Sequence, residues 1–393
     1  MKKAIFKAIF CATLLSSTAF VTSCSKNNDD DTEIQAQELT PDNFKGTISS
    51  GKNLTLDASK TYYLTGIVTV EDGATLTIPQ GTKFIANGGT ASYIIVYRGG
   101  KIYANGTASN PIVFQGINHT PGEWGGLVIL GKATSNRSAS GESTSELGQK
   151  PYGGMENADN SGSLTYVIIK DSGAKFNTEK EFNGLSLFGV GSGTKIDNIY
   201  IENGGDDGIE FFGGAVNASN IVVNGVGDDS FDWTEGWSGT GTNWYGKRRA
   251  SAINGEPGNR GIEADNQDTN PDALPISNPT LKNITVVGSK EGEESQGAKL
   301  RAGTNGNIDN LVIANFKTGL DIETNGSVTW FNKGGKLTNV RFVNVDVESV
   351  GNSGTGKVPI SADVSKAYTK NQTATGAGNG ADIPTWASWT GIK

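Results

Sequence analysis

Two pairs of aspartates, each within the same short motif, are the residues of this chain whose types and spacing most clearly suggest chemistry. Gly205-Asp206-Asp207-Gly208-Ile209-Glu210-Phe211 recurs over positions 227–233 as Gly227-Asp228-Asp229-Ser230-Phe231-Asp232-Trp233. A repeat of roughly 20–50 residues is typical of solenoid proteins. If the two segments stack in neighbouring coils, equivalent side chains lie about 4.8 Å apart. Four carboxylates then gather at one edge of the solenoid.

Stacked carboxylates repel one another, so they need protonation, hydrogen bonds from turn amides, or a bound cation. Carboxylate and carbonyl oxygens are the ligands that Ca²⁺ prefers. We therefore expect a calcium site formed by Asp206, Asp207, Asp228, Asp229 and Asp265. Two alternatives stay open: each aspartate caps its own turn through backbone N–H groups, or Asp207, Asp228 and Asp229 are catalytic.

The elements that must position these residues are short strands. Residues 63–70, 74–85 and 93–100 alternate apolar and polar positions and have glycine at the corners, which is a strand-and-turn pattern. We expect an all-β fold with a single right-handed parallel β-helix over residues 46–350. Residues 351–393 lose the pattern, and we expect them to cap the last coil, which otherwise leaves an open sheet edge.

Two columns of residues can be aligned through the expected coils. One begins with a small residue and the other has asparagine before an aliphatic strand; their members are Gly126, Gly184, Gly208, Ser230, Gly261, Gly297 and Gly319, and Asn198, Asn220, Asn283, Asn310 and Asn339. Recurrent asparagine indicates a ladder of stacked amides. Alternation in the first column points Ile209 and Phe231 inward and Glu210 and Asp232 outward. Residues 131–162, 234–260 and 264–280 are expected to leave the coils as loops.

Composition limits the classes of function. The chain has 393 residues with 55 Gly, 19% charged residues and a formal net charge of −8. It is too apolar for a disordered protein and too rich in glycine for an ordinary helical one. The acidic balance argues against a nucleic-acid partner, whose binding relies on a basic surface.

The N-terminal segment predicts export and a lipid anchor. Lys2, Lys3 and Lys7 precede an apolar run that ends in Val21-Thr22-Ser23-Cys24, and this arrangement resembles a bacterial lipoprotein signal. We expect residues 1–23 to be the signal peptide and Cys24 to be lipidated. Residues 24–45 then form a disordered acidic linker, whose Asp29-Asp30-Asp31 run resembles the surface-export signals of Bacteroidota-type lipoproteins. Cys11 leaves with the signal, so no internal disulfide is expected.

Aromatic residues suggest a binding platform beside the aspartates. The segment 231–245 contains tryptophans among glycines, and flat aromatic faces stack on sugar rings. The alternative is that this loop packs against the solenoid. We expect the binding face to comprise Trp237, Trp244, Tyr245, Phe212, Glu210 and Asp232.

The aspartate motifs also carry a local resemblance to polygalacturonase-type β-helix glycosidases. In that family, acids on two successive coils form an inverting acid/base set, which maps onto Asp207, Asp228 and Asp229. The family's Gly-His-Gly coil is missing, because the only histidine is His119. Pectate-lyase-type β-helices use Ca²⁺ and a basic residue, a role that Lys299 or Arg301 could fill if they are not paired with Asp321 and Glu323.

A broader resemblance covers residues 60–345. Glu123-Trp124-Gly125-Gly126-Leu127, the paired aspartate turns and Trp233-Thr234-Glu235-Gly236-Trp237 together resemble a family of secreted bacterial β-helix surface lipoproteins. This resemblance implies the fold and a lipid-anchored location at the outer membrane. We expect a non-enzymatic binder of an extracellular glycan or host surface ligand, stabilised by calcium. The alternatives are a polysaccharide lyase or glycoside hydrolase acting on an acidic polysaccharide, and a structural or adhesive surface component.

Overall fold

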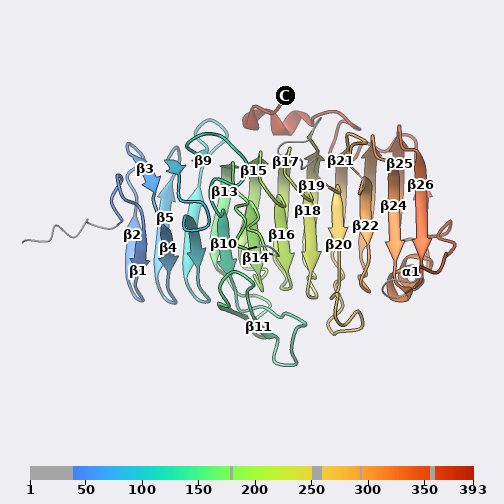
Figure 1. The fold of residues 1–393 in the computed structure, drawn as a ribbon, viewed down its shortest axis with the longest axis horizontal. Helices are drawn as coiled ribbons and strands as arrows, with labels where there is room; N and C mark the ends of the chain where they lie inside the picture. Colours follow the sequence, from blue (N-terminus) through green and yellow to red (C-terminus); the bar gives the residue numbers. More distant parts are fainter. Residues whose placement is uncertain (1–38, 178–179, 250–258, 293, 355–358) are drawn as a thin grey trace, which may run out of the picture. The chain divides into compact units, whose positions relative to one another are not determined.

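A computed structural model of the chain describes residues 39–393 except 178–179, 250–258, 293 and 355–358 (Figure 1). These residues form a right-handed parallel β-helix, so the predicted fold is confirmed. The signal peptide, Cys24 and the linker up to residue 38 lie outside the described residues. Within the described residues, no helix has the length and apolar character needed to cross a membrane.

Two long parallel sheets make the walls of the solenoid. The first sheet has 11 strands: β1 (Gly46–Ile48), β4 (Ile67–Val70), β7 (Tyr93–Val96), β10 (Leu127–Leu130), β14 (Leu185–Phe188), β16 (Ile209–Phe212), β18 (Phe231–Thr234), β20 (Ile262–Ala264), β22 (Gln296–Leu300), β24 (Thr318–Glu323) and β26 (Val347–Asn352). The second sheet follows the path β2 (Asn53–Thr55), β5 (Thr75–Pro79), β8 (Lys101–Asn105), β13 (Gly162–Lys170), β15 (Lys195–Glu202), β17 (Asn217–Asn224), β19 (Thr240–Lys247), β21 (Thr280–Val287), β23 (Asn307–Ala314), β25 (Leu337–Val343) and β27 (Tyr368–Lys370).

The remaining elements decorate this frame. In the N-terminal coils, a third wall is formed by β3 (Thr61–Leu64), β6 (Lys83–Ala86) and β9 (Ile112–Gly116), which joins the second sheet through β13. The expected loop 131–162 contains an antiparallel hairpin of β11 (Glu142–Thr144) and β12 (Pro151–Gly153). A short helix α1 (Asn325–Phe331) and a 3₁₀ helix η1 (Thr385–Thr390) were not expected from the sequence.

The strand faces follow the predicted alternation. Ile209 pairs with Phe231 and Phe211 pairs with Trp233 in neighbouring strands, and all four side chains are buried in the central core. The small-residue column has a steric cause, because a Cβ atom on Gly208 would lie 2.6 Å from the carbonyl oxygen of Ser230 and 2.6 Å from Val223. At the start of β16 the backbone thus lies so close to the next coil that only a small residue fits.

The predicted asparagine ladder is present from Asn220 to Asn310 and includes Asn243, which was not expected, whereas at its ends Asn220 donates to Asp197 and Asn339 donates to Asp309. Nδ2 of Asn283 donates to Oδ1 of Asn243 at 2.9 Å, and Nδ2 of Asn310 donates to Oδ1 of Asn283 at 2.9 Å. Asn243 in turn donates to Asn220 at 3.0 Å. These asparagines have φ values between 55° and 62°, a left-handed conformation that asparagine tolerates better than most residues. The ladder thus fixes the same bend in successive coils.

One expected loop assignment was wrong, and the C-terminal segment has a contact that was not expected. Residues 234–260 do not all leave the coils, because β19 lies within them and pairs in register with β17. The C-terminal segment does more than cover the last coil: Ala377, Trp386 and Ala387 pack on the outer face of the second sheet, against Tyr200 and other residues of its middle strands. The segment runs back along the solenoid because this outer face is apolar and needs a cover.

Replacing Asn283 tests the ladder. The Asn283→Ala variant loses the side-chain hydrogen bonds to Asn243 and Asn310. It also places alanine, which tolerates the left-handed region less well than asparagine, at φ 62°. We expect the free energy of unfolding to fall by about 2–3 kcal/mol in urea titration. The exposed Asn53→Ala control should change it by less than about 0.5 kcal/mol. Equal stability of the two variants would contradict a structural ladder.

Candidate functional site

The paired aspartates lie in stacked turns, as the repeat predicts. The backbone N–H of Asp229 donates to Oδ1 of Asp207 at 2.8 Å. The strands that follow the two turns, β16 and β18, pair in register. Asp207 and Asp229 are only 6% and 1% exposed. Capping of the next coil's turn and carboxylate stacking therefore occur together at this position.

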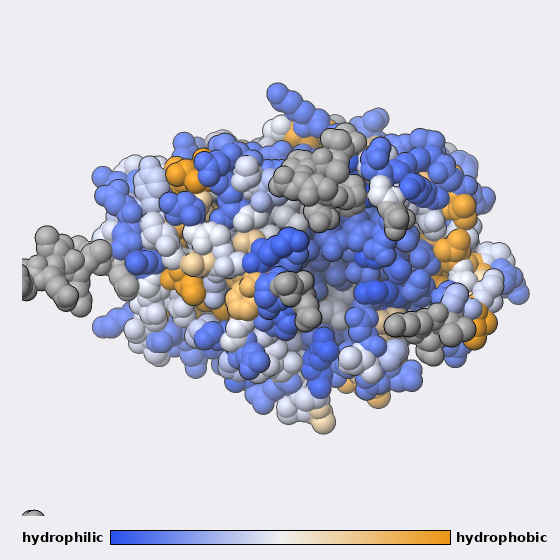
Figure 2. Space-filling model, viewed as in Figure 1, coloured by the Kyte–Doolittle hydropathy of each residue, from blue (hydrophilic) through white to orange (hydrophobic). Residues whose placement is uncertain are grey.

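A second row of acids continues from these turns onto the outer face of the first sheet. Glu210 lies beside Asp232 in the neighbouring strand, and Asp232 lies beside Glu263 in the strand after that. On the same face, Figure 2 shows a broad hydrophilic area over the region of β18, β20 and β22. We call the combined set the acidic strip; it consists of Asp206, Asp207, Glu210, Asp228, Asp229, Asp232 and Glu263.

Carboxylate oxygens of the strip converge in three overlapping triads. Within each triad the oxygens lie within 4.8 Å of one another; the triads are Asp206–Asp207–Asp228, Asp207–Glu210–Asp232 and Asp229–Asp232–Glu263. Asp207 and Asp232 each belong to two triads. The strip is therefore one continuous group of interacting acids.

Burial and mutual repulsion favour the protonated forms of these acids. The pKa of Asp207 is raised well above the usual value by burial and by the neighbouring charge of Asp206. Burial and the charge of Glu210 raise the pKa of Asp232 in the same direction. The pKa of Glu210 is raised by burial and by the charge of Glu146, which the 131–162 loop contributes. Sequence reasoning missed Glu146, because no repeat marks that loop.

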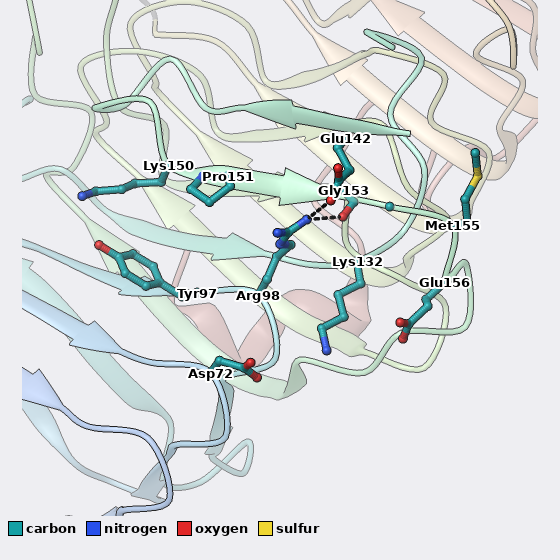
Figure 3. Close-up of a pocket in the computed structure, with 11 residues that line it drawn as sticks. Asp72, Tyr97, Arg98, Lys132, Glu142, Lys150, Pro151, Gly153, Met155 and Glu156 are labelled. Carbon is teal, nitrogen blue, oxygen red and sulfur yellow. Dashed lines mark hydrogen bonds and ion pairs between the residues drawn. The ribbon is translucent and has the colours of Figure 1, made fainter. Parts of the chain in front are cut away.

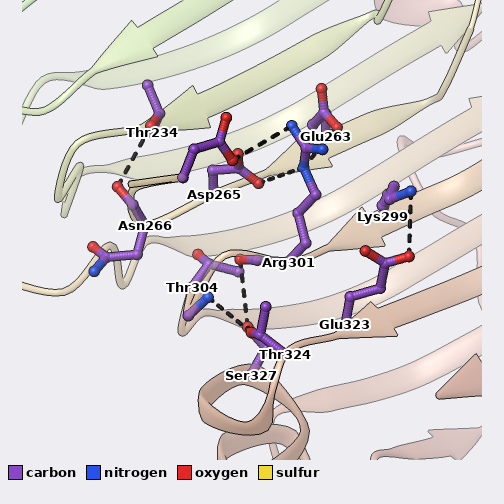
Figure 4. Close-up of polar contacts among 12 residues, drawn as sticks. Thr234, Glu263, Asp265, Asn266, Lys299, Arg301, Thr304, Glu323, Thr324 and Ser327 are labelled. Atoms are coloured by element: carbon purple, nitrogen blue, oxygen red, sulfur yellow. Dashed lines mark hydrogen bonds and ion pairs between the residues drawn. The ribbon is translucent and has the colours of Figure 1, made fainter. Parts of the chain in front are cut away.

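Arginines form ion pairs with two acids of the strip, one just before β18 and one in β20. Arg260 Nη1 lies 3.3 Å from Oδ2 of Asp229 and 3.1 Å from Oε1 of Glu263. Arg301 Nε lies 3.0 Å from Oε1 of Glu263 and 2.9 Å from Oδ1 of Asp265, and Figure 4 shows it between these two acids. Asp265, an expected calcium ligand, belongs to none of the three triads. The carboxylate of Asp265 instead forms an ion pair with Arg301, because the start of the 264–280 loop places Asp265 beside this arginine of the next coil.

Three acids of the strip differ from Asp229 and Glu263 in this respect. Among the described residues, no Lys or Arg forms an ion pair with Asp207, Glu210 or Asp232. Glu210 accepts a hydrogen bond from Nδ2 of Asn183 at 2.7 Å. Oδ1 of Asp232 is buried, and no described group donates to it. Clustered hard oxygens with an orphaned buried acceptor fit a divalent cation of the Ca²⁺ type, which takes six to eight oxygen ligands.

A comparison with protein families agrees with the fold. A family model described as "Pectate-lyase like beta helix domain" matches residues 46–390. The chain belongs to this family. No curated protein matches it. Among solved structures, it is similar to the enzymatically active domain of tailspike protein 2 of bacteriophage CBA120, with 15% identity, a TM-score of 0.26 and coverage of 74% of this chain but 39% of that chain. The chain thus matches less than half of that structure.

In this pectate-lyase-like β-helix, the predicted aromatic platform is not formed by Trp237 and Trp244. Trp237 and Trp244 are both 0% exposed. Trp237 stacks on Phe211 with centroids 4.1 Å apart and donates through Nε1 to the carbonyl of Val216 at 3.1 Å. Trp244 donates through Nε1 to the carbonyl of Ala218 at 3.1 Å. Both rings fill the solenoid core instead of facing solvent.

The two outer aromatics of the expected platform are also covered. Phe212 stacks on Phe188 at 3.9 Å and belongs to a cluster roofed by Tyr152 of the hairpin β11–β12. Tyr245 lies beneath the C-terminal segment, and its hydroxyl donates to the carbonyl of Ala381 at 3.4 Å. Glu210 and Asp232 are the members of the expected binding face that stay partly exposed.

The catalytic alternative fits this geometry poorly. Oxygens of Asp207 and Asp228 lie within 4.8 Å of each other, whereas the carboxyl groups of inverting glycosidases stand roughly 6.5–9.5 Å apart to admit a water molecule. Asp229 is buried and held by Arg260. His119 is far from the aspartates in sequence and pairs with Asp171, with Nδ1 3.2 Å from Oδ2.

The raised pKa values predict an unusual pH dependence in the presence of a chelator. A carboxyl group whose folded-state pKa is raised stabilises the fold at low pH, and this contribution is lost as pH rises through the folded pKa. For Asp321, burial and Glu323 raise the pKa from 3.8 to about 6; Asp207, Glu210 and Asp232 are raised in the same direction. In EDTA, the melting temperature should therefore fall by several degrees between about pH 5 and pH 7.

Acids with lowered pKa values do not cancel this effect. The pKa of Asp309 is lowered by hydrogen bonds from Thr338 and Asn339, so its stabilising contribution is already complete above about pH 5. Differential scanning fluorimetry across that window checks the prediction. A melting temperature that rises with pH in EDTA would show that ionisation of these acids does not destabilise the fold.

Proposed function

We propose that this protein binds an extracellular acidic polysaccharide through calcium held on the acidic strip, without cleaving the chain. The observation that carries the proposal is the set of three overlapping carboxylate triads, together with the orphaned Oδ1 of Asp232. A cation bound there offsets the repulsion among the acids. It also presents a positive centre on a surface that would otherwise repel an anionic ligand.

The position of the strip suits an extended ligand. Glu210, Asp232 and Glu263 occupy equivalent positions in three consecutive parallel strands, so they form a row along the solenoid. Ca²⁺ takes six to eight oxygen ligands, and one triad supplies only part of that number. The remaining positions are available to carboxylates of a sugar chain. Because the family description names pectate lyase, a polygalacturonate is the first ligand to test.

Binding is favoured over a lyase reaction by the state of the nearby cations. A lyase needs a basic group that can accept a proton. The pKa of Arg301 is raised by Asp265 and Glu263 against the opposing effect of burial. Lys299 lies 3.4 Å from Oε1 of Glu323. Both side chains are thus paired with carboxylates.

The Asp232→Asn variant tests the proposal. It removes one charge from two triads while keeping the side-chain shape. By isothermal titration calorimetry with polygalacturonate oligomers, we expect calcium-dependent affinity to fall about tenfold or more, because a metal-bound carboxylate is lost. In EDTA, the same variant should be more stable than the wild type, because like-charge repulsion is relieved.

The exposed Asp42→Asn substitution provides a charge-matched control that should change neither property. Wild-type binding that is equally tight in EDTA would contradict a calcium-mediated contact. Release of shortened oligosaccharides, abolished in Asp228→Asn, would favour the enzyme alternative. No affinity for any acidic glycan would leave the structural or adhesive role.

For location, we propose that a lipid on Cys24 anchors the protein to the outer membrane with the β-helix exposed at the cell surface. The support is the basic start, the apolar run and the Val21-Thr22-Ser23-Cys24 ending of the signal. In the Cys24→Ser variant, the protein should move from the detergent-soluble membrane fraction to the soluble fraction, because one cysteine carries the whole anchor. Retention of this variant in the membrane fraction would exclude lipidation at Cys24 as the anchor, and protection of the wild type from added protease on intact cells would contradict surface exposure.

A further inference from the structure

The hairpin β11–β12 covers an apolar cluster that borders the acidic strip. Arg98 holds the hairpin in place, because its Nη1 donates to Oε1 of Glu142 at 2.6 Å and to the carbonyl oxygen of Gly153 at 3.0 Å (Figure 3). Tyr152 of the same hairpin packs on Phe188, with the ring centroids 5.1 Å apart. Phe188 ends β14, which pairs with β16 of the strip. The insertion is thereby fixed beside the first coil of the strip.

Asn183 lies where this apolar cluster meets the acidic strip. It directly follows Phe182, a buried member of the cluster, and is itself only 2% exposed. Its Nδ2 donates to Oε2 of Glu210 at 2.7 Å and to the hydroxyl oxygen of Ser186 at 3.2 Å. Ser186 and Glu210 are paired in register in neighbouring strands. Both N–H bonds of the amide are thus engaged, so the Asn183 side chain is fixed in one orientation.

The hydrogen bond from Asn183 leaves the second oxygen of Glu210 available. No described residue donates to Oε1 of Glu210. Asp207 has the same arrangement, because its Oδ1 accepts from the backbone N–H of Asp229 at 2.8 Å and its Oδ2 receives no bond from the described part of the chain. Oδ1 of Asp232 is buried and likewise lacks a donor among the described groups. Each acid of this triad therefore keeps an oxygen free for a cation.

The donors that hold these carboxylates differ in charge from those of the next triad. There, Nη1 of Arg260 lies 3.3 Å from Oδ2 of Asp229 and 3.1 Å from Oε1 of Glu263. A guanidinium fixes those acids and also offsets their charge. Asn183 fixes Glu210 with a neutral amide, so the full negative charge of Glu210 remains for a metal ion.

From this geometry we infer that Asn183 is a positioning residue for the calcium site: it holds one oxygen of Glu210 so that the other faces the carboxylates of Asp207 and Asp232. The inference rests on the calcium binding proposed above. Residues that hydrogen-bond a metal ligand orient it, and their loss typically lowers metal affinity roughly 10- to 100-fold. Asn183 acts only through Glu210, because its own amide donors are engaged and its side chain is buried.

The test is calcium titration of the metal-stripped full chain by isothermal titration calorimetry. Asn183→Leu removes the amide at similar side-chain volume, and we expect it to weaken calcium binding roughly 10- to 100-fold. Asn118→Leu is the matched control, because Nδ2 of Asn118 donates to Oε1 of Glu123 at 2.6 Å in a pair that does not belong to the strip. This control should bind calcium like the wild type.

A double-mutant cycle separates positioning from a general effect on packing. Glu210→Gln keeps two of the three carboxylates, so its weaker calcium affinity is measured at millimolar calcium. In this background, Asn183→Leu should lower the affinity by less than about twofold, because the two residues act through one contact. A merely structural role would lower the affinity by the same factor in both backgrounds. If the leucine variant does not fold, Asn183→Ala enters the same cycle.

The outcomes distinguish this inference from the proposed function. Wild-type affinity in the Asn183 variant, or an equal loss with and without Glu210→Gln, overturns the positioning role while calcium binding itself stands. Absence of saturable calcium binding by the wild type overturns the proposed function and the inference together. Loss of affinity in the Asn118→Leu control would show that removal of any such amide disturbs the site, which also overturns a specific role of Asn183.

Discussion

Register between successive coils is the constraint on which the rest of the structure depends. Each turn of the solenoid places a residue directly beside its counterpart one coil earlier, as in the pairing of Glu210 with Asp232 and of Asp232 with Glu263. For apolar residues this produces a continuous core, and for asparagines a hydrogen-bonded ladder. For acids it produces repulsion that a cation or a proton must offset. Stacking of equivalent positions is therefore enough to bring the acids of successive coils together.

Repetition also explains how much of the fold could be predicted from the sequence. Gly208 and Ser230, or Asn283 and Asn310, occupy the same place in successive coils, so their spacing indicates the turn and the stacking directly. Trp237 and Trp244 were misplaced because glycines around them suggested a loop. Asn243 directly before Trp244 was the available signal, since it continues the asparagine column. The predicted column has an aliphatic residue after each asparagine, whereas the core also accepts a tryptophan there.

The candidate site was predictable only in its repeated part. Asp207 and Asp229 could be placed because they belong to the coils. Glu146 and the hairpin β11–β12 come from an insertion without any repeat, and only the folded structure shows which coil the insertion covers. The pairing of Asp265 with Arg301 depends in the same way on the path of the 264–280 loop. The regular coils thus supply the acidic strip, and the insertions supply the residues that surround it.

The central claim is that Asp207, Glu210 and Asp232 of the acidic strip hold a divalent cation. Calcium titration of the metal-stripped full chain at neutral pH, followed by calorimetry, tests this claim most directly. The account predicts saturable binding of at least one Ca²⁺ per chain, lost when Glu210→Gln and Asp232→Asn are combined. Absence of saturable binding at millimolar calcium, or binding that survives in the double variant, would contradict it.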